Sequence, residues 1–197
     1  MTEAVRWGER LVLIPLAALV IVRIAPQLWD HPEVAMFLVS EIVGVALLLL
    51  QRKGAWATGF FPVAIAFIGT SVGLLVVPVG TQLVPDVVSA VLVMTGGAIA
   101  LAAKLFLGRS FGVVPANRGV KEAGVYRFVR HPMYAGYMLN HMGFLLVFFS
   151  WQNIAIYAVA WTAFWLRAVE EEKFLCQDPE YARYSGKVRY RLVPGVA

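Results

Sequence analysis

Residues 132–166 read PMYAGYMLNHMGFLLVFFSWQNIAIYAVAWTAFWL and contain no Asp, Glu, Lys or Arg. Two apolar segments, 133–149 and 152–168, occupy this stretch and are separated by only a few residues around 150–153. Apolar segments joined so closely predict a tight helical hairpin. Each is about 17 residues long, near the lower limit for spanning a bilayer, so a full and a partial crossing both fit.

Four more apolar segments precede the hairpin, at 10–29, 33–51, 59–79 and 86–107. The chain of 197 residues is 60% hydrophobic and only 15% charged, with a mean hydropathy of +0.72. This composition excludes a water-soluble globule. We therefore predict an all-α fold, a polytopic integral-membrane helical bundle of five to six transmembrane helices that ends in the helical hairpin. A removable leader is not expected, because apolar segments recur along the whole chain.

Basic residues are concentrated in alternate loops. They lie before the first apolar segment, after the second and after the fourth, whereas the loops 30–33 and 79–86 carry no Lys or Arg. By the positive-inside rule, both termini, the loop 108–130 and the tail 169–197 are predicted to face the cytoplasm. The net charge of +5 is therefore interpreted as an orientation signal, and no nucleic-acid partner is expected.

Several notable residues fall inside or beside the apolar segments. Glu41 is expected to pair within the bundle, and Arg23 to extend toward an interface. Gly96 and Gly97 follow no strand, so we interpret them as helix-packing glycines rather than a nucleotide-binding loop. The single cysteine, Cys176, and three histidines without ligand spacing predict no metal site.

The hairpin begins with the sequence RHPMYAG at residues 130–136. Pro132 disfavours helix at His131 and suits the first helical position, so a helix is expected to start there. The free N–H groups of that helix, its dipole and the Arg130 guanidinium would together bind a carboxylate or phosphate. The sequence therefore predicts an anion-binding corner at the cytoplasmic boundary.

Helical spacing beyond this corner produces two faces. One face carries Tyr134, Tyr137, Met138 and His141, and a narrower stripe carries Gly136, Asn140 and Gly143. The stripe permits close approach of a neighbouring helix. The aromatic face fits simple packing as well as a binding site, and the sequence leaves both interpretations open.

Three consecutive carboxylates, Glu170, Glu171 and Glu172, follow the second helix of the hairpin. Arg167 and Glu171 have the i, i+4 spacing of an ion pair, so a solvated helix end is the simplest interpretation. Neighbouring carboxylates repel one another, however, and a bound cation is the alternative interpretation.

The runs GVYRFVRHPMYAG (124–136), RAVEEEKFL (167–175) and EYARYSGKVRYRLVPGV (180–196) together resemble the isoprenylcysteine carboxyl methyltransferase family, which is related to the membrane phospholipid methyltransferases. The resemblance covers about the last 90 residues. It implies an integral-membrane enzyme that uses S-adenosylmethionine, held in a cytoplasmic cofactor pocket, with a lipophilic substrate entering from the bilayer. Residues 1–107 would then be N-terminal transmembrane helices, and 108–197 the methyltransferase catalytic region.

The resemblance also implies roles for individual residues. The cofactor-binding set would comprise Gly119, Val120, Lys121, Tyr126, His131, Pro132, Met133, Tyr134, Glu171 and Glu172. Arg167, together with Arg130 and Glu171, would be catalytic, with Arg167 facing the methyl acceptor. These implied roles agree with the chemistry of the residues. A helix start and Arg130 suit the cofactor's carboxylate, and Glu171 or Glu172 suits its ammonium or hydroxyl groups.

A prenylcysteine-type carboxylate is the expected acceptor, because a carboxylate is already ionised at pH 7 and needs no general base. A phospholipid headgroup and a thiol are the alternatives, and each must first lose a proton. The ending VRYRLVPGV also resembles NADPH-dependent sterol reductases, and a non-catalytic membrane protein is a third possibility. The compact length favours a multi-pass protein of a prokaryotic inner membrane.

Overall fold

A computed structural model describes residues 3–29, 32, 34–57 and 59–195. Of the described residues, 72% are helical, which confirms the helical part of the prediction. The helices are α1 (Glu3–Ile24), α2 (Val34–Leu49), α3 (Phe60–Ser71), α4 (Asp86–Leu107), α5 (Pro132–Val147), α6 (Trp151–Leu175) and α7 (Pro179–Lys187), with four short 3-10 turns, η1 (Ala25–Leu28), η2 (Val72–Leu75), η3 (Gly108–Ser110) and η4 (Gly124–Arg127). Two short strands, β1 (Ala55–Trp56) and β2 (Ala116–Asn117), pair antiparallel.

The six predicted apolar segments correspond to α1 to α6, but three boundaries differ. Helix α1 begins at Glu3 rather than at residue 10, because polar residues of its first turns have partners in the fold. The third segment becomes irregular after Leu75, and α6 continues to Leu175. Among the described residues only Asp86–Ser110 is long and apolar enough to cross a membrane, while Ala35–Leu49 and Phe60–Leu75 are shorter. The number of spans therefore stays a prediction.

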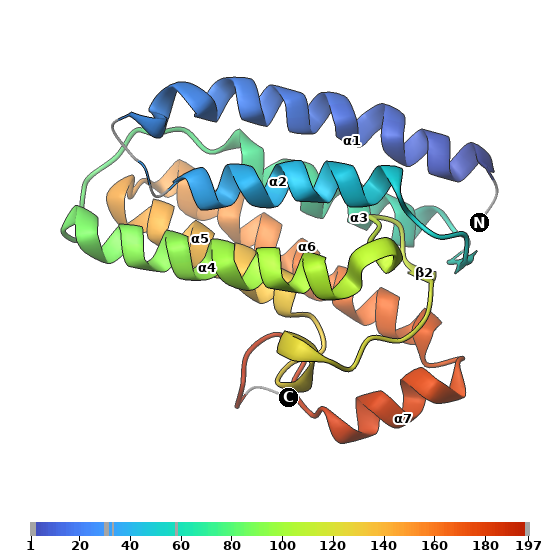
Figure 1. Ribbon diagram of the computed structural model, residues 1–197. Helices are drawn as coiled ribbons and strands as arrows, with labels where there is room; N and C mark the ends of the chain where they lie inside the picture. Colours follow the sequence, from blue (N-terminus) through green and yellow to red (C-terminus); the bar gives the residue numbers. More distant parts are fainter. Residues whose placement is uncertain (1–2, 30–31, 33, 58, 196–197) are drawn as a thin grey trace.

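Helices α4 and α5 are in close contact through glycines (Figure 1). A Cβ on Gly136 would lie 2.6 Å from the carbonyl oxygen of Gly96, and a Cβ on Gly143 would lie 3.0 Å from that of Ser89. The Ser89 hydroxyl donates a hydrogen bond of 2.9 Å to the Gly143 carbonyl. The glycine stripe is thus a helix-packing surface, as predicted.

The basic loops gather at one end of the bundle, where α1 begins and α2 and α4 end (Figure 1). Arg10 and Arg109 donate to the carbonyls of Leu49 and Leu50, at 2.8 and 3.0 Å, and so cap the end of α2. At the opposite end, the Asn153 side chain bonds to Val77 and Phe148. Most of the predicted loop 30–33 lies outside the described residues.

Glu41 has a partner within the bundle, as the sequence predicts. Lys104 is 1% exposed and donates to Glu41 Oε1 at 2.9 Å and to the Ser40 carbonyl at 2.8 Å. Gly44 makes room for this ammonium group, since a Cβ there would come within 3.2 Å of it. Arg23 donates instead to the carbonyls that end η2, at Leu74 and Val76.

Candidate functional site

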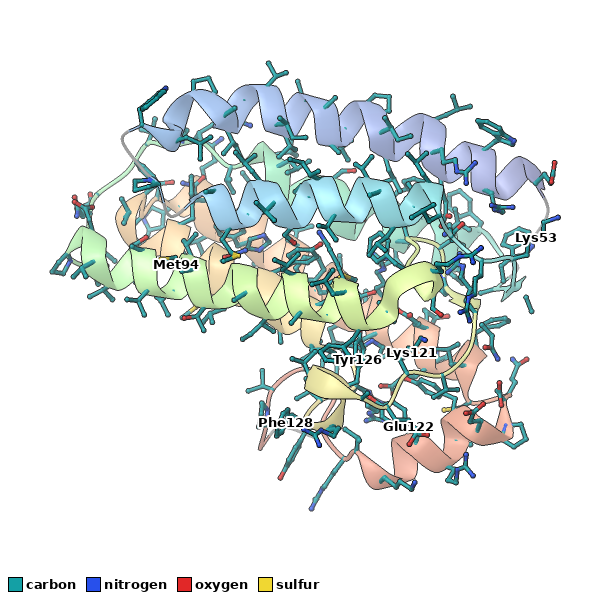
Figure 2. The ribbon with its side chains drawn as sticks, viewed as in Figure 1. Lys53, Met94, Lys121, Glu122, Tyr126 and Phe128 are labelled. Atoms are coloured by element: carbon teal, nitrogen blue, oxygen red, sulfur yellow. The ribbon has the colours of Figure 1, made fainter. Side chains whose placement is uncertain are left out.

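Two cavities meet in the part of the bundle that bears the basic loops. The smaller, of about 80 Å³, lies among the segment after α4, the start of α5, the end of α6 and α7. Figure 2 shows the side chains of Lys121 and Tyr126 in this region, between the bundle and α7. Predicted site residues that line this cavity are Gly119, Val120, Lys121, Tyr126, Arg130, His131, Met133, Tyr134 and Glu171. We call it the cofactor-side cavity.

Glu171 links the two motifs. Its Oε2 accepts a hydrogen bond of 3.0 Å from the Tyr134 hydroxyl and lies 4.0 Å from Nδ1 of His131. The carboxylate side chain is 27% exposed and lines the cofactor-side cavity. The stretches 130–136 and 167–175, which are distant in the chain, therefore share one wall.

Glu172 is directed elsewhere. Its carboxylate accepts from Nε of Arg191 at 2.8 Å, lies 3.1 Å from Nε2 of His131 and 3.3 Å from Nε of Arg130. Burial alone would raise the pKa of Glu172, but the hydrogen bonds from His131 and Arg191 and the charge of Arg130 hold it below its ordinary value. Neither Glu172 nor Pro132 lines the cofactor-side cavity, in contrast to the predicted cofactor-binding set.

The three consecutive carboxylates thus have three different environments. Glu170 binds Lys173 at 2.6 Å on the surface, and Glu172 is neutralised by protein cations. Glu171 accepts from the neutral Tyr134 hydroxyl, lies 4.0 Å from His131 and interacts electrostatically with Arg118. This difference follows from the rotation of about 100° between successive helical residues, and it turns Glu171, unlike Glu170 and Glu172, toward the cofactor-side cavity.

The C-terminal tail holds the RHPMYAG motif in place. The backbone N–H groups of Arg130 and His131 donate to the carbonyls of Tyr190 and Arg191, at 2.9 and 2.8 Å. The Arg130 side chain also donates to the Arg189 carbonyl at 3.3 Å. Arg130 lines the cavity but is already engaged by Glu172 and the tail, so the free anion donor that the sequence predicts is only partly available.

Two tyrosines of α7 were not singled out as site residues by the sequence analysis. Tyr184 donates to the Tyr126 carbonyl at 2.8 Å, and Tyr181 has a buried hydroxyl without a partner among the described residues. Burial and the charges of Glu171 and Glu172 raise the pKa of Tyr181, so its hydroxyl stays protonated and can donate. Their i, i+3 spacing, with Tyr181 and Tyr184 on one helical face, was the available signal.

A buried carboxylate of α1 organises the loop after α4. Glu9 is 1% exposed and accepts from the backbone N–H groups of Val113 and Val114, at 3.1 and 2.5 Å. It also lies 3.9 Å from the guanidinium of Arg118, which lines the cofactor-side cavity. No local sequence pattern indicates a role for Glu9, because its partners Gln51, Val113 and Val114 lie 42 to 105 residues further along the chain.

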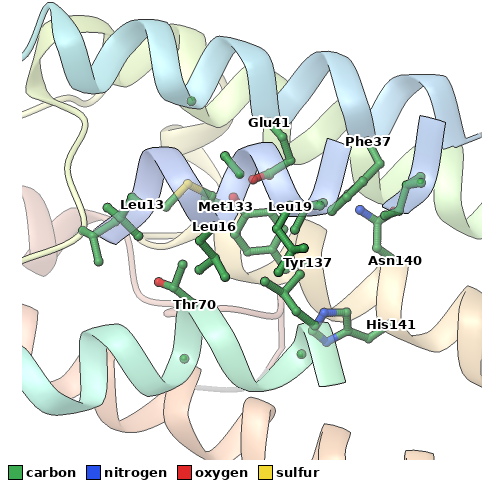
Figure 3. A pocket seen from close by; sticks show the side chains of 18 of the residues that line it. Leu13, Leu16, Leu19, Phe37, Glu41, Thr70, Met133, Tyr137, Asn140 and His141 are labelled. Atoms are coloured by element: carbon green, nitrogen blue, oxygen red, sulfur yellow. The ribbon is translucent and has the colours of Figure 1, made fainter. Parts of the chain in front are cut away.

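The larger cavity, of about 300 Å³, lies among α1 to α6 and is mostly apolar (Figure 3). Its wall includes Leu13, Leu16 and Phe37, and it reaches the surface at Leu19, which is 63% exposed. Met133 lines this apolar cavity as well as the cofactor-side cavity. The two cavities are therefore neighbours with a shared wall.

Arg167 lines the apolar cavity and is only 4% exposed. It donates to the Val113 carbonyl at 2.6 Å and to the Thr70 hydroxyl at 3.2 Å, and its Nε has no partner among the described residues. The expected ion pair with Glu171 is wrong: within the part of the chain that the structure describes, no carboxylate lies within 4.0 Å of this guanidinium. Its charge is instead directed across the Tyr134 ring, whose centroid lies 5.2 Å away.

The aromatic face of α5 packs and also lines a cavity. Tyr134, Tyr137 and His141 surround Phe164, with ring centroids 5.5, 5.9 and 5.8 Å away. Tyr137 and His141 line the apolar cavity. The structure thus shows packing of this face and places part of it in a cavity wall, and its role in binding stays a prediction.

Residues 86–178 match the family model described as phospholipid methyltransferase. The matched region runs from the start of α4 to the residue before α7 and contains the RHPMYAG and Glu170 to Glu172 motifs. This confirms the resemblance to the isoprenylcysteine carboxyl methyltransferase-like membrane methyltransferases and supports a membrane methyltransferase. No curated protein sequence matches the chain.

Proposed function

We propose, because residues 86–178 match the phospholipid methyltransferase family model, that the chain transfers a methyl group from S-adenosylmethionine to the carboxylate of a lipophilic acceptor. A prenylcysteine-type carboxylate is the acceptor we favour. The proposal rests on Arg167, a buried cation without an ion-pair partner among the described residues, which lines the apolar cavity next to the cofactor-side cavity.

The residues of the cofactor-side cavity fit S-adenosylmethionine. Glu171 offers a carboxylate to an ammonium or to ribose hydroxyls, and Tyr181 offers a hydroxyl donor that has no partner among the described residues. The cavity, at about 80 Å³, is smaller than the roughly 300–1,000 Å³ of typical ligand sites, so its walls would have to move apart on binding. When bound, S-adenosylmethionine supplies an electrophilic methyl group.

Arg167 suits an anionic acceptor. A buried guanidinium without a counter-ion is costly, and an acceptor carboxylate would neutralise it and could satisfy its free Nε. The mostly apolar wall, with Leu13, Leu16 and Phe37, would hold a long hydrocarbon chain. This division assigns Glu171 to the cofactor and Arg167 to the acceptor.

Positioning would account for catalysis without a general base. A carboxylate is ionised at pH 7, and holding it in line with the methyl donor can contribute up to about 7–11 kcal/mol. His141 is poorly suited to be a base, since its Nδ1 already accepts a hydrogen bond of 3.2 Å from the Trp161 indole. An amine or thiol acceptor would need such a base.

A multi-pass location in a membrane, with the basic end of the bundle in the cytoplasm, is part of the proposal. Large apolar side chains are exposed around the helices, for example Leu11 at 71%, Val22 at 72% and Val91 at 57%. Exposed apolar surface on several helices favours contact with lipid. A prokaryotic inner membrane remains our proposed location.

A phospholipid headgroup is a second candidate acceptor. The description of the matching family favours it, and its phosphate could also pair with Arg167. Its ammonium group, however, must lose a proton before attack, and the positive charge of Arg167 opposes binding of that ammonium. We therefore rank it below a carboxylate.

The test is methyl transfer by the purified protein with radiolabelled S-adenosylmethionine and three acceptors: a prenylcysteine, phosphatidylethanolamine and a lipophilic thiol. We expect a base-labile methyl ester on the prenylcysteine and loss of that product in Arg167→Ala. Base-stable N-methylation of phosphatidylethanolamine alone would contradict the carboxylate assignment. Binding of NADPH without binding of S-adenosylmethionine would contradict methyl transfer itself.

A further inference from the structure

We infer that Asn140 and His141 form a polar subsite within the apolar cavity, which binds a neutral oxygen, a hydroxyl or carbonyl, on the hydrocarbon chain of the acceptor. The inference rests on the proposed function in one respect: the acceptor is taken to occupy this cavity. Figure 3 shows both side chains among those that line it, near Phe37 and Tyr137.

Asn140 is buried with its hydrogen-bonding capacity unused. The residue is 8% exposed, and neither Nδ2 nor Oδ1 has a partner among the described residues. Its Oδ1 lies against α4 at Gly96, where a Cβ would come within 2.9 Å of it. An unsatisfied amide in an apolar wall is destabilising, so a ligand that forms a hydrogen bond with it gains affinity.

His141 presents a second donor in the lining of the same cavity. The Trp161 indole N–H can only donate, and it does so to Nδ1 of His141 at 3.2 Å. In the neutral ring the proton is therefore on Nε2. That nitrogen lies beside η2, where a Cβ on Gly73 would come within 3.2 Å, and it has no acceptor in the described part of the chain.

The donors define the ligand chemistry. Both the Asn140 amide and the His141 ring are uncharged and offer N–H groups, which suit an oxygen acceptor without net charge. Asn140 lies six residues beyond Tyr134 on α5, about 9 Å along the helix axis. If the acceptor carboxylate binds to Arg167, beside the Tyr134 ring, the neutral oxygen bound by Asn140 would lie roughly 9 Å further along the hydrocarbon chain of the acceptor.

The experiment compares the binding of oxygenated and plain chains in detergent. Palmitic acid, its monohydroxylated and monoketo positional isomers, and the methyl esters of all of them are titrated against wild type, Asn140→Leu, Asn140→Ala and His141→Phe. We expect wild type to prefer one oxygenated position over the plain chain by about three- to tenfold. Both Asn140 variants should lose this preference while they bind the plain chain at least as well, and His141→Phe should reduce it.

The free acids and the methyl esters form two ligand series, which separate this inference from the proposed function. The methyl esters lack the carboxylate, so the preference of the protein for an oxygenated ester does not depend on Arg167. Equal affinity of acids for wild type and Arg167→Ala would contradict the proposed function alone. Absence of an oxygen preference in both series, or a preference that survives in both Asn140 variants, would overturn the subsite. Unchanged S-adenosylmethionine affinity in the variants serves as the folding control.

Discussion

The hydroxyl of Tyr134 donates a hydrogen bond of 3.0 Å to Glu171, 37 residues further along the chain. On its other side, the Tyr134 ring lies 5.2 Å from the guanidinium carbon of Arg167. Tyr134 therefore stands between a carboxylate that lines the cofactor-side cavity and a cation that lines the apolar cavity. About one helical turn of α6 separates Arg167 from Glu171, and Tyr134 contacts the first with its ring and the second with its hydroxyl.

Replacement of Glu171 by Gln is expected to weaken the binding of S-adenosylmethionine at least about tenfold, because a charge-assisted hydrogen bond is lost. Isothermal titration calorimetry of the purified protein measures this change. Glu170→Gln is the matched control, since Glu170 binds Lys173 on the surface and should leave affinity unchanged. Equal loss in both variants would show that the effect is nonspecific.

Replacement of Arg167 by Ala is expected to lower kcat/KM for the acceptor on the order of 100-fold, while the Kd of S-adenosylmethionine changes little. The reason is that Arg167 faces the apolar cavity rather than the cofactor-side cavity. Methyl-transfer kinetics and calorimetry together measure the two effects. Arg109→Ala, which removes an exposed arginine bonded to a carbonyl, is the control. A comparable loss of cofactor affinity in Arg167→Ala would refute the division of roles.

The Glu172 carboxylate is expected to make stability depend on acid pH. Because the pKa of Glu172 in the fold lies below its ordinary value of 4.5, its contribution is fully present above pH 4.5 and is lost as pH falls through the lowered pKa. Melting temperatures in detergent over this range measure the dependence. Glu172→Gln should flatten that part of the curve and lower the unfolding free energy at pH 7 by about 2 kcal/mol. An unchanged curve would contradict the role of this cluster.

Gly136→Ala is expected to destabilise the fold by about 1–3 kcal/mol, since the new Cβ would lie 2.6 Å from the Gly96 carbonyl and 2.7 Å from the Ala100 nitrogen. Gly186→Ala in α7 is the matched control, because nothing lies within 4 Å of its Cβ position. There alanine should be neutral or stabilising by up to about 1 kcal/mol. Denaturant unfolding in detergent compares the two, and equal effects would exclude the close contact of α4 and α5.

The single cysteine offers a direct test of orientation. Cys176 is exposed and lies at the end of α6, near the basic end of the bundle. A membrane-impermeant maleimide should label it in inverted vesicles and not in right-side-out vesicles. A cysteine placed at Val79, at the opposite end, in a Cys176→Ser background should show the reverse. Labelling of Cys176 only from the outside would contradict the proposed orientation.

Local sequence patterns predicted much of the fold correctly. Pro132 marks the first residue of α5, and the glycine stripe of α5 meets α4. The basic loops, which alternate along the chain, lie at one end of the bundle. These features depend on helical periodicity, on the backbone preferences of proline and on the placement of charge, all of which act within a few residues.

The partners of the charged site residues could not be predicted in the same way. The i, i+4 spacing predicted an ion pair between Arg167 and Glu171, and the sequence did not distinguish Glu171 from Glu172. In the structure, Arg191 of the tail donates to Glu172, whereas Tyr134 contacts Glu171 with its hydroxyl and Arg167 with its ring. Glu9 was not recognised at all, since its partners come from a loop far along the chain.

Residue patterns alone predict that the chain forms apolar helices, where the main ones lie, and which two stretches carry the polar chemistry. The packing of distant segments reveals that Glu171 faces one cavity and Arg167 another, that Glu172 is neutralised by protein cations, and that Asn140 lacks a partner among the described residues. The physical reason is range: helix formation and amphipathic faces follow from neighbours three or four residues apart, whereas ion pairing and burial depend on segments brought together from the whole chain.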